Sequence, residues 1–372
     1  MGKAAVLIGI DQPLEIRDDV ETEAPHAGEV KVRMAASGVC HSDLSMQNGT
    51  IMVGMPPIVL GHEGAGIIEE VGPKVTRVKE GDHVVCSFIP SCGSCRFCST
   101  GQQNLCDLGA MLLDGGLPAG GYRFHQGGED FGAMCMIGTF SQWSVISEFS
   151  CVPVAHDIPL ETAVLVGCGV PTGWGSSVNG AAVRPGDTVV IYGIGGIGIN
   201  AVQGARHAGA RNVVAVDPLA NKREKAEEMG ATHSAATAEE AQKLVWDELA
   251  PGVGADSSII TVGIVDEDVV NAGVDVIRKG GRVVITGLAD PAKKTVNVSG
   301  ALLTLYQKSI HGLLFGGCNP IYDIKRLLDL YQAGQVKLDE LITKQYRLDE
   351  VNQGYQDLLD GKNVRGVIVH EH

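Results

Sequence analysis

The 372-residue chain has no run of about eighteen apolar residues, so nothing in it is expected to span a bilayer. It shows no secretory signal, because its first apolar stretch is brief and soon interrupted by charge. Positive charge is scarce: 29 Lys and Arg stand against 44 Asp and Glu, and the net charge of −15 argues against nucleic acid or an anionic membrane as a partner. With 44% hydrophobic and 20% charged residues, the composition predicts a compact soluble protein.

Four of the ten cysteines lie close together in the sequence. Two residues separate Cys92 from Cys95 and two separate Cys95 from Cys98, and Cys106 follows after seven more. Four thiolates with these gaps can surround one tetrahedral zinc ion, and Gly93 supplies the backbone freedom that the tight loop needs. A disulfide cluster is the alternative, but nothing else about the chain is typical of a secreted protein. A zinc ion with four protein ligands has no open coordination position for a substrate. We therefore predict a structural zinc site in a cytoplasmic protein.

The pattern of apolar residues changes along the chain. The first 150 residues carry short apolar runs separated by Gly, Pro and Asp, which predicts a β-rich domain, with a Gly-rich surface loop at residues 109–133. From Arg184 to Leu288 apolar strands alternate with helical segments, which predicts a parallel sheet covered by helices on both faces. The predicted strands there are Thr188–Tyr192, Asn212–Val216, Asp256–Val262 and Arg282–Thr286, and the helices are Ile197–Ala208, Pro218–Met229, Ala238–Leu249 and Asp266–Lys279.

Two details complete this prediction. Pro218 is expected in the first turn of its helix, where a missing N–H costs nothing. After Leu313 the sequence predicts an amphipathic helix, a second helix near Leu348–Leu359 and a final strand at Val364–Val369. The apolar face of the first of these helices consists of Ile321, Ile324, Leu327, Leu328 and Tyr331.

A glycine-rich motif follows the predicted strand Thr188–Tyr192 and precedes a helix: Gly193-Ile194-Gly195-Gly196-Ile197-Gly198. The first glycine permits a tight turn, the second lets the backbone approach a pyrophosphate, and the last allows close packing of helix on strand. Asp217 ends the next strand, where its carboxylate can accept hydrogen bonds from an adenosine ribose and would repel a 2′-phosphate. The motif therefore predicts a dinucleotide site that favours NAD over NADP, although Asp217 could instead be a helix cap.

Further metal ligands are less certain from the residues alone. Cys40, His62 with Glu63, and Cys168 are candidates, but each could be a buried cysteine or a hydrogen-bonded histidine of the core. Their spacing does not bring them together, because they lie far apart in the sequence.

Here a resemblance adds information. Cys40-His41-Ser42-Asp43, Gly61-His62-Glu63, the four cysteines, Gly167-Cys168-Gly169 and the glycine motif at 193–198 occur in one order along the whole chain. In this the chain resembles the zinc-dependent alcohol dehydrogenases of the medium-chain dehydrogenase/reductase superfamily. The resemblance implies a GroES-like catalytic domain at 1–169, with its zinc lobe at about 91–107, a Rossmann domain at 170–312 and a return to the catalytic domain at 313–372.

The resemblance also implies roles for individual residues. Cys40, His62 and Cys168 would bind a catalytic zinc with an open fourth position, while Glu63 lies behind the metal and Asp43 orients His62. The zinc would lower the pKa of an alcohol, whose hydride passes to NAD. Ser42 would accept the alcohol proton, but many relatives have a His where this chain has Ser45, so the end of the relay is open. Further positions implied by the resemblance are Thr172 beneath the nicotinamide, His41 and Arg365 at the pyrophosphate, Lys222 and Arg223 at the adenosine ribose, and Ile51, Phe88 and residues 134–137 at the substrate.

The segments Ser87–Gly93, Gly167–Gly175 and Val364–Val369 are most similar to an actinobacterial branch of nicotinoproteins, which keep NAD(H) bound and use dimethyl-nitrosoaniline as an artificial acceptor. Class III enzymes, which oxidise S-(hydroxymethyl)glutathione, are a second interpretation, but they usually carry an Arg soon after the last lobe cysteine, where this chain has Asp107-Leu108-Gly109-Ala110. A non-catalytic NAD-binding protein is a third. The predicted enzyme uses two zinc ions, acts on a primary or aromatic alcohol, and forms a homodimer or homotetramer.

Overall fold

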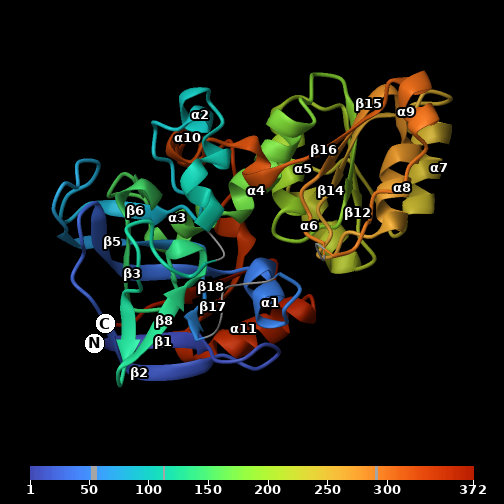
Figure 1. Cartoon of the computed structure of the whole chain (residues 1–372). Coiled ribbons are helices and arrows are strands. Elements are labelled where there is room, and N and C mark those ends of the chain that lie inside the picture. Colours follow the sequence, from blue (N-terminus) through green and yellow to red (C-terminus); the bar gives the residue numbers. More distant parts are fainter. Residues whose placement is uncertain (52–56, 112–113, 290–291) are drawn as a thin grey trace. The chain divides into compact units, whose positions relative to one another are not determined.

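The computed structural model of the chain describes residues 1–51, 57–111, 114–289 and 292–372 (Figure 1). The chain divides into two compact units, Met1–Cys168 with Asn319–His372, and Gly169–Cys318. The first unit is therefore assembled from both ends of the chain. The predicted domain limits, 169/170 and 312/313, fall within a few residues of the limits of these units. No helix among the described residues has the length and apolar character needed to cross a membrane.

A small closed barrel forms one part of the first unit. Its strands, in order around the barrel, are β1 (Gly2–Leu7), β2 (Glu15–Thr22), β7 (Phe124–Gln126), β8 (Glu129–Ala133) and β4 (Ile58–Val59). Phe124 and Phe131 pair directly across the hairpin, and both rings are fully buried in the barrel core beside Val6 and Val59. The prediction of a surface loop at 109–133 is thus wrong for residues 124–133. Gly127 and Gly128 form the turn between two short strands that close the barrel, and these glycines made the segment resemble a loop in the sequence. Residues 112 and 113 lie outside the described residues.

The larger sheet of the first unit is organised around its longest strand, β3 (Glu29–Val39). β3 pairs antiparallel with β5 (Gly64–Val71), β9 (Trp143–Ser147) and β18 (Arg365–Val369). Gly366 lies opposite Val39, so the C-terminal strand brings Arg365 close to Cys40. Three strands complete the sheet, β6 (His83–Cys86) and β10 (Cys151–Pro153) beyond β5, and β17 (Ile342–Tyr346) beyond β18. β17 was not predicted from the sequence, because three of its five residues face solvent at the sheet edge.

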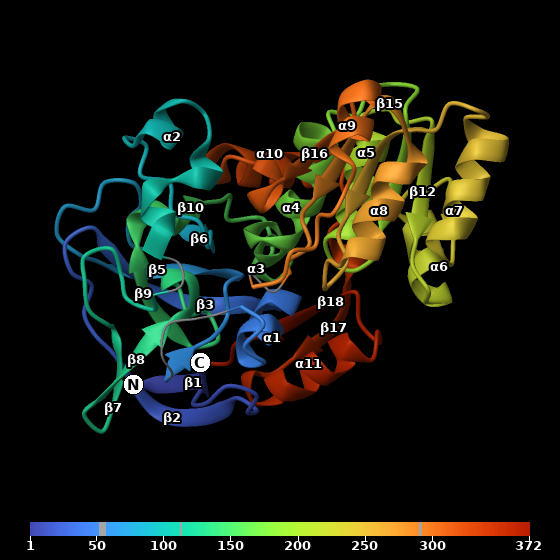
Figure 2. The same ribbon diagram turned by 45° about the vertical axis from the view of Figure 1, so that its right-hand side comes forward.

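Five helices accompany these strands: α1 (His41–Gln47), α2 (Arg96–Ser99), α3 (Leu160–Ala163), α10 (Pro320–Gln332) and α11 (Val351–Leu359). The cysteine-rich lobe that contains α2 lies beside α10 in both views (Figures 1 and 2), and the Gln103 N–H donates to Oδ1 of Asn319 at 2.8 Å. α10 buries Ile324, Leu327 and Leu328, which confirms the predicted amphipathic face. Its Pro320 stands in the first turn, where no backbone donor is lost.

The second unit is a six-stranded parallel sheet with the order β13-β12-β11-β14-β15-β16. Its strands are β13 (His233–Ala235), β12 (Asn212–Val216), β11 (Thr188–Tyr192), β14 (Ala255–Ile260), β15 (Ile277–Ile285) and β16 (Ser309–Gly312). The direction of winding reverses between β11 and β14, so the carboxyl end of β11 lies at the switch point where such sheets bind ligands. This confirms the predicted doubly wound parallel sheet.

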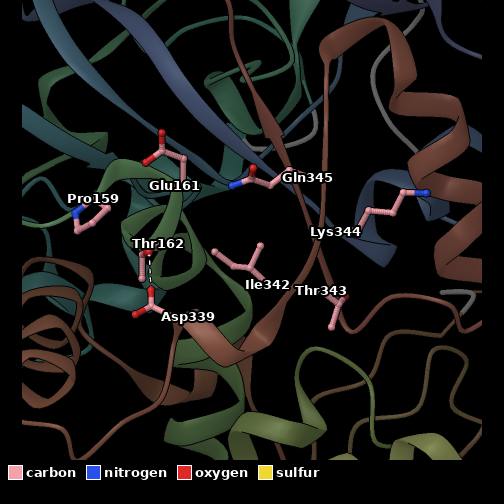
Figure 3. A pocket seen from close by; sticks show the side chains of 8 residues that line it. All are labelled: Pro159, Glu161, Thr162, Asp339, Ile342, Thr343, Lys344 and Gln345. Carbon is pink, nitrogen blue, oxygen red and sulfur yellow. Dashed lines mark hydrogen bonds between the residues drawn. The ribbon is translucent and has the colours of Figure 1, made fainter.

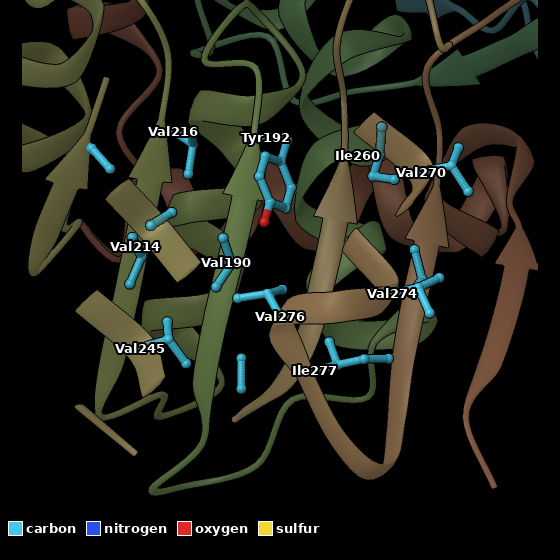
Figure 4. Packing of buried hydrophobic residues seen from close by; sticks show 14 of the residues in the cluster. Val190, Tyr192, Val214, Val216, Val245, Ile260, Val270, Val274, Val276 and Ile277 are labelled. Carbon is cyan, nitrogen blue, oxygen red and sulfur yellow. The ribbon is translucent and has the colours of Figure 1, made fainter. Parts of the chain in front are cut away.

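The helices of the second unit are α4 (Gly169–Gly175), α5 (Gly198–His207), α6 (Ala220–Glu228), α7 (Ala238–Leu244), α8 (Glu267–Val276) and α9 (Gly300–Tyr306). One face of the sheet packs on α7 and α8 through a cluster that includes Val190, Val214, Val245, Val270 and Val274 (Figure 4). Fully burying a valine side chain stabilises the fold by about 1.5–3 kcal/mol, so this cluster accounts for much of the unit's stability.

The structure corrects one helix start. α6 begins at Ala220 rather than at Pro218, and the preceding Leu219 is extended. The Leu219 N–H donates to Oδ1 of Asp217 at 3.0 Å, which holds the chain in an extended turn before the helix begins. The predicted use of Pro218 in the first helical turn is therefore wrong.

Candidate functional site

The four clustered cysteines converge as predicted. The sulfur atoms of Cys92, Cys95, Cys98 and Cys106 all lie within 4.8 Å of one another. Backbone N–H groups point at them: Cys95 donates to the sulfur of Cys92, and Cys98 to that of Cys95, each at 3.4 Å. Burial opposes ionisation of Cys92, but N–H groups of Ser94 and Cys95 outweigh it and lower the pKa of Cys92 to about 6. Such N–H contacts favour thiolates, the form in which cysteine binds metal.

A second group of donors lies in the interior of the first unit. The donor atoms of Cys40, His62, Glu63 and Cys168 are all within 4.8 Å of one another, and all four residues are buried. Cys40 follows β3 and caps α1, His62 follows Gly61, whose φ of +91° favours glycine, and Cys168 follows a short 3-10 helix, Val164–Gly167. The structure thus brings together the three remote residues predicted to share a metal.

His62 is held in a defined orientation. Its Nδ1 lies 3.0 Å from Oδ1 of Asp43, which indicates that Nδ1 carries the proton. Asp43 also accepts the N–H of Gly61 at 3.1 Å and the N–H of Cys40 at 3.3 Å, so one carboxylate holds both segments. The Nε2 atom of His62 is buried and has no hydrogen bond within the part of the chain that the structure describes. A ring nitrogen without a hydrogen bond, on a histidine grouped with two thiols, is suited to bind a metal ion.

Glu63 forms a buried ion pair with Arg365 through Nη2 and Oε2. Arg365 is only 3% exposed, so the alternative that it is an ordinary surface residue is wrong. Burial raises the pKa of Glu63 to about 7, and the charge of Arg365 opposes this rise. A Cβ atom at Gly38 would overlap Oε2 of Glu63, so a glycine is needed there for close approach. Sequence reasoning missed Gly38, because no motif marks it.

The other predicted residues of the first unit lie around this group. Oγ of Ser42 is 3.8 Å from the sulfur of Cys40, and Ser45 is buried one turn further along α1. The ring of Phe88 meets that of His62 edge-on, with centroids 5.7 Å apart. His41 and Ile51 are half-buried, and the segment 134–137 is buried with left-handed backbone at Cys135 and Met136. Cys86, Cys135, Cys151 and Cys318 are buried and belong to neither group.

In the second unit the glycine motif follows β11. Gly193 has φ +87°, and its N–H donates to the Val216 carbonyl at 2.8 Å. A Cβ at Gly198 would overlap the Gly193 carbonyl oxygen, which explains the close packing of α5 on the turn. A Cβ at Gly195 would meet no atom within 4 Å, so the backbone there borders open space. The cradle therefore has the shape expected for a pyrophosphate site.

Asp217, which follows the neighbouring strand β12, stabilises this turn. Its Oδ2 accepts the N–H of Ile194 at 2.9 Å, and Nζ of Lys222 lies 4.0 Å away. Arg223 donates to the backbone carbonyls of Asp217 and Pro218. Gly196 accepts from the amide of Asn200, and Thr172 is buried on α4 of the same unit. Thr261, which sequence reasoning missed, donates to the Gly193 carbonyl at 2.6 Å.

A surface hollow of the first unit has no part in either metal group (Figure 3). Oγ1 of Thr162 donates to Oδ1 of Asp339 at 2.8 Å across it. None of the predicted site residues lines it. Its lining residues are Pro159, Glu161, Thr162, Asp339, Ile342, Thr343, Lys344 and Gln345.

Comparison with known families agrees with this arrangement. Residues 26–156 match the alcohol dehydrogenase GroES-like domain, and residues 196–333 match the zinc-binding dehydrogenase family. The chain belongs to the zinc-type alcohol dehydrogenases of the medium-chain dehydrogenase/reductase superfamily, and it is an oxidoreductase that acts on alcohols. This confirms the resemblance drawn from the sequence and excludes a non-catalytic protein on the same fold.

Among its relatives is the NDMA-dependent alcohol dehydrogenase of Amycolatopsis methanolica, 62% identical over 99% of this chain and 98% of the relative. A solved alcohol dehydrogenase zinc-binding domain protein from Burkholderia ambifaria superposes with a TM-score of 0.93 at 31% identity, covering 100% of this chain and 99% of the other. Benzyl alcohol dehydrogenase from Acinetobacter calcoaceticus gives 0.90 at 29% identity, with 100% and 99% covered.

Proposed function

We propose that this chain oxidises a primary or aromatic alcohol with a zinc ion held by Cys40, His62 and Cys168 and with NAD as hydride acceptor. The observation that carries the proposal is His62, whose buried Nε2 has no hydrogen bond within the described residues and one of whose ring nitrogens lies within 4.8 Å of the sulfur atoms of Cys40 and Cys168. A zinc ion with three protein ligands supplies a Lewis acid at its open position. We further propose that the four lobe cysteines hold a second, structural zinc.

The chain's own residues would then orient the metal ligands and move a proton. Asp43 keeps the proton of His62 on Nδ1, which leaves Nε2 free to bind. Ser42, whose Oγ lies 3.8 Å from the Cys40 sulfur, is our proposed acceptor of the alcohol proton. Ser45 is only 5% exposed and carries no base, so the last transfer would pass to His41 or to water. The ion pair of Glu63 with Arg365 would lie behind the metal.

For the cofactor we propose the cradle at Gly193, Gly195, Gly196 and Gly198, with Asp217 on the adenosine ribose and Lys222 nearby. The nicotinamide of NAD supplies the hydride acceptor. A carboxylate at the end of β12 disfavours the 2′-phosphate of NADP. We retain His41 and Arg365 as pyrophosphate contacts and Thr172 as a nicotinamide contact, on the strength of the family resemblance.

Two glycine variants separate cofactor binding from folding. In Gly195→Ala the new methyl occupies open space, so we expect an unchanged melting temperature but NAD binding weakened by about tenfold, roughly 1.4 kcal/mol. In Gly198→Ala the methyl overlaps a backbone carbonyl, so we expect a loss of about 1–3 kcal/mol of stability as well. Calorimetry of the cofactor-free proteins and NAD titration measure the two effects. Equal melting temperatures for the two variants would contradict the assignment.

We also propose that NAD(H) stays bound through turnover, because the relative from Amycolatopsis methanolica is named NDMA-dependent. Purified protein should release about one NAD(H) per chain on denaturation, and turnover should require a nitroso acceptor rather than added NAD. Both are measured directly, by absorbance of the released cofactor and by rate with each acceptor. Protein stripped of cofactor that is fully active on added NAD would overturn this proposal while leaving the alcohol dehydrogenase assignment in place.

The preference for an apolar or aromatic alcohol rests on the Phe88 ring beside His62 and on the likeness to a benzyl alcohol dehydrogenase. The class III interpretation remains the second candidate, but it would need a cation for the anionic glutathione adduct. The lobe continues after Cys106 with Asp107, which offers the opposite charge. Comparing kcat/KM for benzyl alcohol with that for S-(hydroxymethyl)glutathione decides between them.

We propose a homo-oligomer that associates through the edge of the second unit. α9 has no buried residue although it carries Leu302, Leu305 and Tyr306, which are 47%, 75% and 39% exposed. It lies next in the chain to β16, one of the two edge strands of its sheet. The proposed compartment is the cytoplasm, whose reducing conditions suit ten cysteines that form no disulfide.

Leu305→Asp is therefore expected to weaken association by at least about 30-fold, because loss of an apolar anchor costs about 2 kcal/mol or more. Light scattering after size-exclusion chromatography, over a dilution series, measures the change. Leu359→Asp is the control, since Leu359 is 58% exposed and lies on α11 of the first unit. A Leu305 variant with unchanged mass at every concentration would exclude this interface.

A further inference from the structure

Tyr355 presents a buried hydroxyl group that the proposed mechanism does not use. It lies on α11, its side chain is 3% exposed, and its hydroxyl makes no hydrogen bond to any residue that the structure describes. Buried hydroxyl groups nearly always have a partner, because leaving one unpaired costs free energy. Tyr346, which is equally buried, shows the usual case: its hydroxyl meets Asp357 at 2.9 Å and Asn363 at 3.0 Å.

Packing contacts connect Tyr355 with the segment that carries His62. Its ring packs against Phe140, with centroids 6.3 Å apart and a tilt of 52°. The Phe140 ring in turn lies against Gly61, where an added Cβ would come within 2.7 Å of its Cδ1. The Gly61 N–H donates to Oδ1 of Asp43. Tyr355 therefore stands one layer behind the residues that position His62.

Helix packing also connects the helix that carries Tyr355 with the helix that carries Asp43. α11 packs against α1, which carries Asp43, and the two helices lie side by side in both views (Figures 1 and 2). Burial, and next the charge of Asp43, raise the pKa of Tyr355, so its hydroxyl stays protonated and can donate. Oδ1 of Asp43 already accepts two hydrogen bonds, whereas Oδ2 accepts, among the described residues, only the long one from Cys40. Oδ2 thus has capacity for a further donor.

We propose that Tyr355 is a positioning residue, whose hydroxyl donates through one ordered water to Oδ2 of Asp43 and so holds that carboxylate on both Cys40 and His62. A bridging water would give the hydroxyl the partner that it lacks among the described residues, and buried polar groups that do not touch are commonly bridged in this way. The inference rests on the proposed function, since it concerns the orientation of the proposed metal ligands.

The test compares Tyr355→Phe with Tyr346→Phe in enzyme whose zinc at the Cys40 site has been exchanged for cobalt(II). Tyr355→Phe should shift the visible cobalt bands, lower kcat with little change in KM, and release metal to a chelator about tenfold faster, the scale of effects from partners of metal ligands. Tyr346→Phe removes a structural hydroxyl and should lower the melting temperature while leaving the cobalt bands unchanged. A high-resolution structure of the wild type should contain the bridging water.

Three results would overturn the inference. Unchanged bands and kcat in Tyr355→Phe, with an equal or higher melting temperature, would show that the hydroxyl has no partner. Equal band shifts in the two variants would show a general effect of lost hydroxyls. A wild-type enzyme that takes up no cobalt through Cys40, His62 and Cys168 would overturn the proposed metal site itself, which distinguishes that failure from the first two.

Discussion

Cys40→Ser is expected to lower kcat by about a thousandfold or more and to reduce the zinc content from two ions to one per chain. The reason is the loss of one of three ligands, and with it Lewis-acid stabilisation worth several kcal/mol in the transition state, where each 1.4 kcal/mol is about tenfold in rate. Steady-state kinetics and metal analysis of the same preparation measure both quantities. Cofactor content should stay unchanged, because the glycine cradle lies in a different unit of the chain.

Two further variants make this prediction specific. Cys151→Ser is the matched control: Cys151 is 2% exposed in the same unit but belongs to neither metal group, so both zinc ions and activity should remain. Cys98→Ser should also leave one zinc, yet its main effect should be on stability, since structural zinc contributes directly to folding. If Cys40→Ser kept two zinc ions and near-normal kcat, the proposed catalytic site would be wrong.

Arg123→Met is expected to destabilise the first unit by about 3–5 kcal/mol, the usual cost of leaving a buried charge without its partner. Arg123 is 4% exposed and meets both carboxylate oxygens of Glu29, at 2.8 and 2.9 Å. Glu29, itself 2% exposed, would keep the N–H of His26 as its single donor within the described part of the chain. Chemical denaturation followed by a probe of the first unit measures the loss.

The matching comparison is Arg17→Met, which removes an ion pair with Glu15 whose side chains are 33% and 49% exposed. Exposed pairs contribute about 0–1 kcal/mol, so this variant should be almost neutral. The double variant Glu29→Leu with Arg123→Met should recover most of the lost stability, because no lone charge remains. A double variant as unstable as the single one would mean that packing, rather than charge, dominates at this position.

Prediction from the sequence was best where the relevant residues are neighbours in the chain. The four lobe cysteines and the glycine motif depend on spacings of a few residues, and both take the expected form. Four of the six strands of the second unit, β11, β12, β14 and the second half of β15, were also predicted, because each contains consecutive valine or isoleucine residues. The short strands β13 and β16 lack such a run and were not predicted. Other short strands were also missed: β7 and β8 lie among glycines, and β17, at a sheet edge, carries mostly exposed polar residues.

Predictions that depended on distant segments needed the resemblance or the structure. Nothing local in the sequence pairs Arg365 with Glu63, or Arg123 with Glu29, because each pair is separated by many strands. The start of α6 was predicted too early for a different reason. The Leu219 N–H donates to the side chain of Asp217, and this hydrogen bond outweighs the preference of Pro218 for the first turn of a helix.

The sequence by itself determined the parts whose chemistry is local: a cysteine lobe with the spacing of a zinc site, a glycine turn shaped for a dinucleotide, and a parallel sheet between helices. Only the tertiary structure decided that Cys40, His62 and Cys168 share one buried point with Glu63. The physical reason is the pairing of β3, which sets β5 on one side and β18 on the other and so aligns segments more than a hundred residues apart. Hydrogen-bonded register between strands, which no local pattern encodes, turned separate side chains into a site.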